Sequence, residues 1–117
     1  MPLPESLERF RAYPGMYLVD VSLNSVLSFL IGFDCACSFG VFVGFKEWLV
    51  LSLDGGENFA WDALIRNKLR AAGIDERGDG VAEFVMAVVA EFWEVSRTRH
   101  GLERIFVDYH AWLAKES

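Results

Sequence analysis

The sequence predicts an all-α fold, a compact single-domain bundle of about five to six helices over residues 1–117. Hydrophobic residues make up 53% of the 117 residues, which is enough to build one core. Apolar residues recur at intervals of three and four along most of the chain, as they do on one face of a helix. No proline occurs after residue 14, so no pyrrolidine ring interrupts the later helices.

A first helix is predicted from the helical spacing of Leu7, Phe10 and Tyr13. It must end before Pro14, because the residue that precedes a proline avoids the helical conformation. Ser22 is placed to cap a second helix. The apolar positions of this second helix are Leu23, Val26, Leu27, Leu30 and Ile31. Its other face carries almost no charge, which is typical of a helix that its own protein or a partner covers.

Residues 41–53 are open to two interpretations. Phe42, Phe45 and Leu49 have the spacing of a third helix. The apolar run over residues 48–53 also fits a buried strand, and Asp54-Gly55-Gly56 could turn a hairpin. We favour the helix because the neighbouring segments are helical. An α+β fold with a small hairpin around residues 48–61 is the alternative.

A fourth helix is predicted to follow, capped by Asn58. Gly73 and Ile74 fit the Schellman motif that ends many helices, in which a glycine adopts the left-handed conformation. Asp62 and Arg66 are four residues apart, so we expect them to form an ion pair on the surface of this helix.

The fifth helix has the clearest pattern, a broad apolar stripe with glutamates on the opposite face. The stripe consists of Phe84, Val85, Val88, Val89, Phe92, Trp93 and Val95. The outward glutamates are Glu83, Glu91 and Glu94. A last helix is predicted from about Leu102 to Lys115. The short connections between these helices imply antiparallel neighbours.

Charge and targeting signals narrow the function classes. Seventeen acidic against eleven basic side chains give a net charge of −6, which argues against a nucleic acid partner because phosphate binding needs clustered Lys and Arg. The N-terminus lacks the basic-then-apolar layout of a signal peptide. Residues 21–45 are long enough to span a bilayer, but Asp34 and three glycines interrupt them. We expect a cytoplasmic protein without a membrane span.

No motif for catalysis or metal binding stands out. Cys35 and Cys37 are badly spaced for a disulfide and too few for a zinc site, so we expect reduced, buried thiols. His100 and His110 have no second ligand at metal-binding spacing. We therefore predict no metal and no cofactor. An enzyme that uses scattered carboxylates and a histidine is the third function class, because catalytic triads assemble across a fold.

Several short motifs are distributed over most of the chain. The segment 13–18 (YPGMYL) precedes a helix that ends in Gly-Phe-Asp at 32–34, and FKEWL (45–49) and NFAW (58–61) come before an acidic aromatic helix. This layout resembles small, acidic, helical bacterial proteins, some of which are immunity proteins of polymorphic-toxin and contact-dependent inhibition systems. The resemblance implies no catalytic residue. It implies tight, stoichiometric binding to a cognate toxin domain, often basic, whose active site the immunity protein covers.

The candidate partner-binding surface combines the polar turn before the fourth helix with the glutamates of the fifth. It consists of Asp54, Glu57, Asn58, Trp61, Glu83, Glu91 and Glu94. Four tryptophans exceed what so small a core requires, and we expect Trp61 to lie outside it because it follows the polar turn. The alternative is a small-molecule-binding or regulatory helical domain with an aromatic pocket. A homodimer is a separate possibility, because the uncharged second helix could bury its far side in a second copy.

Overall fold

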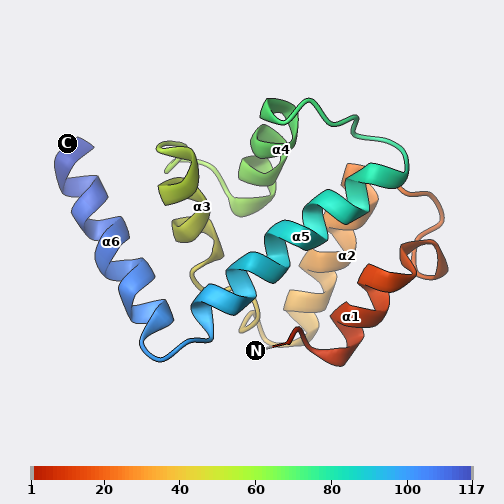
Figure 1. The fold of residues 1–117 in the computed structure, drawn as a ribbon, viewed down its shortest axis with the longest axis horizontal. Helices are drawn as coiled ribbons and strands as arrows, with labels where there is room; N and C mark the ends of the chain where they lie inside the picture. Colours follow the sequence, from red (N-terminus) through yellow and green to blue (C-terminus); the bar gives the residue numbers. More distant parts are fainter. Residues whose placement is uncertain (1, 117) are drawn as a thin grey trace.

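The computed structural model describes residues 2–116, apart from the side chain of Asp79. Within this range the chain forms six α-helices and one short 3-10 helix, without a β-strand (Figure 1). In chain order the elements are α1 (Glu5–Ala12), η1 (Pro14–Met16), α2 (Leu23–Ala36), α3 (Phe45–Leu53), α4 (Trp61–Ala71), α5 (Asp79–Ser96) and α6 (Gly101–Glu116). The all-α prediction is confirmed. The alternative hairpin is wrong, because residues 48–53 lie within α3.

The long helix α5 is the centre of the fold. It contacts α1, α2, α4 and α6, and in Figure 1 it crosses the front of the molecule with α1 and α2 towards one end and α6 at the other. The shorter α3 packs against both α4 and α6. The helix α3 also contacts α5. The rings of Phe45 and Phe92 lie 4.8 Å apart, and both side chains are fully buried. Burying a side chain of this size stabilises the fold by about 1.5–3 kcal/mol.

Two helix ends form as the sequence predicts. The Ser22 hydroxyl accepts a hydrogen bond of 3.2 Å from the Ser25 amide and so caps α2. At the end of α4, Gly73 has a φ of 73°, and the Ile74 amide donates to the Leu69 carbonyl over 3.2 Å. This is the hydrogen bond of a Schellman motif, and the left-handed φ explains why glycine is found at this position.

The predicted cap of α4 is wrong. The helix begins at Trp61, the residue before it is Ala60, and no side chain caps it. Gly56 has a φ of 88° and its carbonyl accepts a hydrogen bond of 2.9 Å from the Phe59 amide, so the turn continues to residue 60. Asn58 is exposed within this turn, before the first helical residue.

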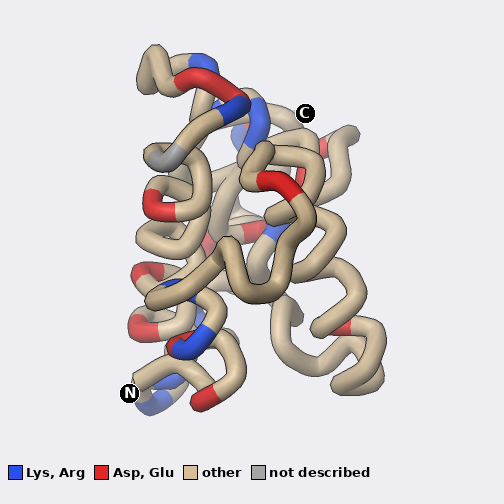
Figure 2. Tube along the Cα trace, turned by 90° about the vertical axis from the view of Figure 1, so that its right-hand side faces the viewer, with Lys and Arg blue, Asp and Glu red and all other residues tan. Residues whose placement is uncertain are grey.

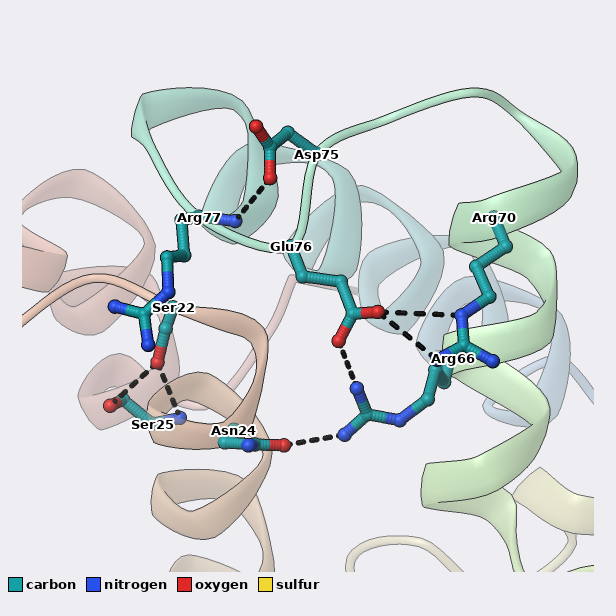
Figure 3. Close-up of polar contacts among 8 residues, drawn as sticks. All are labelled: Ser22, Asn24, Ser25, Arg66, Arg70, Asp75, Glu76 and Arg77. Carbon is teal, nitrogen blue, oxygen red and sulfur yellow. Dashed lines mark hydrogen bonds and ion pairs between the residues drawn. The ribbon is translucent and has the colours of Figure 1, made fainter.

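Arg66 pairs outside its own helix, contrary to the expected pair with Asp62. Its guanidinium group contacts the carboxylate of Glu76 and the side-chain oxygen of Asn24 (Figure 3). Arg70 lies 3.3 Å from the other oxygen of the Glu76 carboxylate. The backbone carbonyl of Glu76 accepts a hydrogen bond of 2.7 Å from the Leu23 amide. Glu76 therefore joins α4 and the start of α2 to the segment that leads into α5.

The connection between α2 and α3 is held by a buried carboxylate. Asp34 accepts hydrogen bonds from the amides of Val41 and Phe42 at 3.1 and 3.3 Å.

Cys35 and Cys37 are exposed free thiols, so the expectation that they are buried is wrong. Among the described helices, none is both long and apolar enough to cross a membrane.

Candidate functional site

Different elements hold the two groups of candidate residues. Asp54, Glu57 and Asn58 lie in the turn between α3 and α4, and Trp61 is the first residue of α4. The three glutamates lie on α5. The turn contacts α6, a helix that supplies none of the predicted site residues. This contact brings together carboxylates and aromatic rings that are far apart in the sequence.

Asp54 ends α3 and reaches across to α6. Its φ of 54° is in the left-handed region, where the chain turns away from the helix. One carboxylate oxygen of Asp54 accepts a hydrogen bond of 2.7 Å from the indole nitrogen of Trp112. A bond from an N–H group to a charged acceptor is stronger than a neutral one. Asp54 thus fixes the orientation of an indole ring 58 residues further along the chain.

Tyr109 lies one turn before Trp112 on α6. The two rings are stacked, with centroids 6.4 Å apart and planes inclined by 16°. Burial raises the pKa of the Tyr109 hydroxyl, and the negative charges of Glu47 and Glu57 raise it further. The neutral hydroxyl is therefore favoured over the phenolate, as expected in an environment of negative potential.

Five residues of this region form what we call the α3–α6 surface: Glu47, Asp54, Glu57, Tyr109 and Trp112. The sequence pattern indicated Asp54 and Glu57 but missed the other three. Tyr109 and Trp112 are three residues apart in α6 and so share a face, but nothing in the local sequence pattern indicates that the turn after α3 meets that face.

Carboxylates beside aromatic rings are suited to binding cations. A Lys or Arg side chain can pair with a carboxylate while it lies on the face of a tyrosine or tryptophan ring. Asp54 is exposed, and Glu57, Tyr109 and Trp112 are half-buried, so all four remain accessible from outside. The α3–α6 surface is therefore chemically suited to basic side chains of another protein.

Trp61 packs on the core, contrary to the expectation that it lies outside it. Its ring centroid is 5.0 Å from that of Phe42 and 5.4 Å from that of Phe45. Because α4 begins at Trp61 and packs against α3, the ring turns inwards onto the phenylalanines. The side chain is half-buried.

Glu83, Glu91 and Glu94 are all exposed on α5, as the sequence predicts. In Figure 2 acidic segments follow one another along the left-hand side, and basic segments gather near the N-terminus. Glu94 borders a shallow hollow that Arg11 of α1 also lines. The end of this row of glutamates at Glu94 is therefore close to positive charge.

The hollow between α3 and α6 bears on the small-molecule alternative. Trp48, Leu51 and Ile105 contribute apolar surface to it, and Arg99 and Arg104 also line it. Its volume is about 250 Å³, below the range of about 300–1,000 Å³ typical of ligand pockets. A more open hollow, lined by His100, Glu103 and Asp108, has a volume of about 500 Å³, which lies within that range.

The remaining candidates for chemistry are exposed. Both histidines lie at the surface, and His100 pairs with Glu103 of the next turn over 3.1 Å. The described side chains form no group of three His, Cys, Asp or Glu residues placed to hold a metal ion.

Comparison of the chain with models of known families, with curated proteins and with solved structures finds no match.

Proposed function

We propose that this protein is a cytoplasmic immunity protein, a stoichiometric inhibitor that binds a basic bacterial toxin domain and covers its active site. The observation that carries the proposal is the α3–α6 surface. There the indole N–H of Trp112 donates a hydrogen bond of 2.7 Å to Asp54, and the charges of Glu47 and Glu57 contribute to the raised pKa of Tyr109. A net charge of −6 attracts a basic partner over long distances.

The rings of this surface are suited to be binding hot spots. Tryptophan and tyrosine are enriched among the few residues that dominate interface energies, where truncation costs about 2 kcal/mol or more. Trp112 is already held by Asp54 and by stacking on Tyr109, so less rotamer freedom is lost on binding. A preorganised ring gives the complex a slow dissociation rate.

The glutamates of α5 have a different role in this proposal. Glu83, Glu91 and Glu94 are exposed, and solvent screens exposed charges. Charges of this kind mainly raise the association rate by steering the partner, whereas desolvated contacts set the dissociation rate. We assign the three glutamates of α5 to steering and the α3–α6 surface to direct contact.

The test is binding to the toxin domain encoded beside this protein, measured by surface plasmon resonance and by protection of cells on co-expression. Glu47→Gln with Glu57→Gln should raise the dissociation rate about tenfold, which corresponds to about 1.4 kcal/mol. Trp112→Phe keeps a ring but removes the N–H donor to Asp54, and it should also raise the dissociation rate.

The matched control is Glu83→Gln with Glu91→Gln, which removes the same number of charges from α5. It should slow association and weaken its salt dependence, while the dissociation rate stays unchanged. Equal effects of the two charge pairs on dissociation would remove the α3–α6 surface from the interface. Failure of the toxin domain to form any complex, together with no protection, would rule out the proposed function.

A further inference from the structure

The second helix has an outward face without charge. The residues exposed on this face, which we call the outer face of α2, are Asn24, Ser28, Ile31, Gly32, Cys35 and Ala36, and Asn24 at its N-terminal end contacts Arg66. The one charged residue of α2, Asp34, points away from it and is buried against the amides of residues 41 and 42. Ile31 is 44% exposed, although its spacing placed it with the core residues of the helix.

Apolar surface continues from this face onto the connection between α1 and α2. Phe29 is half-buried beside the outer face, and its ring stacks on Phe10 with centroids 3.9 Å apart. Tyr17 contacts Phe29 edge-on at 5.7 Å and is 46% exposed, and the neighbouring Met16 is 79% exposed. Tyr17 and Met16 therefore add exposed apolar surface on the side of α2 that faces α1.

Gly32, in the middle of the outer face, adds a separate observation. Glycine weakens the interior of a helix relative to alanine. A Cβ atom at Gly32 would meet no heavy atom within 4 Å, so packing within this chain does not require glycine there. At Gly101, in contrast, a Cβ atom would lie 2.2 Å from the carbonyl oxygen of Val95. The close approach of a second helix would give glycine a role at position 32.

We propose that two copies of this chain pair through the outer face of α2 as a two-fold symmetric dimer. In such a dimer the same patch lies on both sides of the interface. Each copy carries a net charge of −6, so a surface that bears carboxylates would be repelled by its own copy. The outer face of α2 has no charge and can meet itself without that cost.

The shape of the face also favours a second helix of the same kind. Ser28, Gly32 and Ala36 follow each other at intervals of four residues, so they form one row along α2. Small side chains in a row allow two helix backbones to approach closely, and Ile31 beside the row supplies apolar contact area. A basic partner would find no carboxylate here with which to pair.

The dimer does not depend on the proposed inhibitory function. The outer face belongs to α2, whereas the α3–α6 surface belongs to helices placed towards the other end of the molecule in Figure 1. A dimer of this kind would leave both α3–α6 surfaces available.

Sedimentation velocity over a range of protein concentrations tests the dimer. The wild-type chain should show a reversible monomer–dimer equilibrium. Ile31→Glu places like charges opposite each other and should weaken dimerisation at least tenfold. The control is Val107→Glu, which adds the same charge at another exposed aliphatic residue on a helix, on α6, and should leave the equilibrium unchanged.

Gly32→Ala separates an interface role from a structural one. The variant should raise the melting temperature of the dilute monomer, because alanine favours the helix, and it should also weaken the dimer. Alkylation of Cys35 should slow as the wild-type concentration rises, and this dependence should disappear in Ile31→Glu.

Two results would overturn the inference. One is a wild-type chain that stays monomeric at all attainable concentrations. The other is a dimer that Ile31→Glu and Val107→Glu leave equally intact, because the contact would then lie on another face.

Discussion

The carboxylate of Asp34 determines the path of the chain between α2 and α3. One of its oxygens accepts hydrogen bonds from two consecutive amides, those of Val41 and Phe42. The side chain is buried, and both amides belong to buried residues, so water is poorly placed to replace the carboxylate. An amide left without a partner in such a place costs about 1–3 kcal/mol.

Replacing Asp34 by alanine should therefore lower the free energy of unfolding by about 2–4 kcal/mol, since two buried donors lose their acceptor. Asp34→Asn keeps an acceptor oxygen of the same shape and should cost less than half as much. Urea unfolding followed by circular dichroism measures both variants. A loss below about 0.5 kcal/mol in the alanine variant, as at an ordinary surface site, would contradict this role.

Tyr109 allows a test of the charges around it by titration. Burial raises the pKa of its hydroxyl first, and Glu47 and Glu57 add to the effect. Glu47→Gln with Glu57→Gln should lower this pKa towards the unperturbed value of about 10, while the contribution of burial remains. Tyrosinate absorbance measures the pKa in a background with Tyr13→Phe and Tyr17→Phe. The same pKa with and without the two carboxylates would show that they do not act on Tyr109.

The same shift has a consequence for stability at high pH. The pKa of Tyr109 is higher in the folded than in the unfolded chain, so the folded state keeps this proton longer. The contribution is complete below about pH 10 and is lost as the pH rises through the folded pKa. Tyr109→Phe should remove this part of the alkaline loss of stability, whereas the charge pair Glu83→Gln with Glu91→Gln should not.

At the scale of elements, the turn between α5 and α6 depends on a glycine. Gly101 is the first residue of α6 and is buried. His100 before it has a φ of 63°, and the Gly101 amide donates to the Thr98 carbonyl over 2.9 Å. The two longest helices therefore meet at a turn with no room for a side chain at Gly101.

Gly101→Ala should destabilise the protein by about 1–3 kcal/mol, because the new Cβ atom would lie 2.2 Å from the Val95 carbonyl oxygen. Gly80→Ala is the matched control, since a Cβ atom there meets nothing within 4 Å and the residue lies in α5. The control should be neutral or more stable than the wild type by up to about 1 kcal/mol. Thermal unfolding of both variants distinguishes the two sites, and equal melting temperatures would contradict the steric argument.

At the scale of the whole molecule, charged and uncharged surfaces lie on different elements. The α3–α6 surface carries three carboxylates, and α5 carries three exposed glutamates. The outer face of α2 carries no charge. Since charged groups steer a partner and uncharged faces permit self-contact, this division fits the two kinds of contact that we propose.

Local information in the sequence determined most of the helices. The cap at Ser22 and the stop at Gly73 depend on hydrogen bonds between residues a few positions apart, so the sequence predicts them directly. The apolar period of α5 has the same local character. The cap expected at Asn58 failed because the preceding turn extends two residues further than the pattern suggested.

Only the tertiary structure decided which side chains meet across the fold. Asp54 bonds to Trp112 because α3 packs on α6, and Arg66 contacts Glu76 because the segment before α5 folds back along α4. Trp61 packs against the core for the same reason, the packing of α4 on α3. Helical periodicity indicates which face of a helix is apolar, but it does not encode which helix covers that face. The local sequence therefore determines the helices, whereas the α3–α6 surface forms only when these helices pack together.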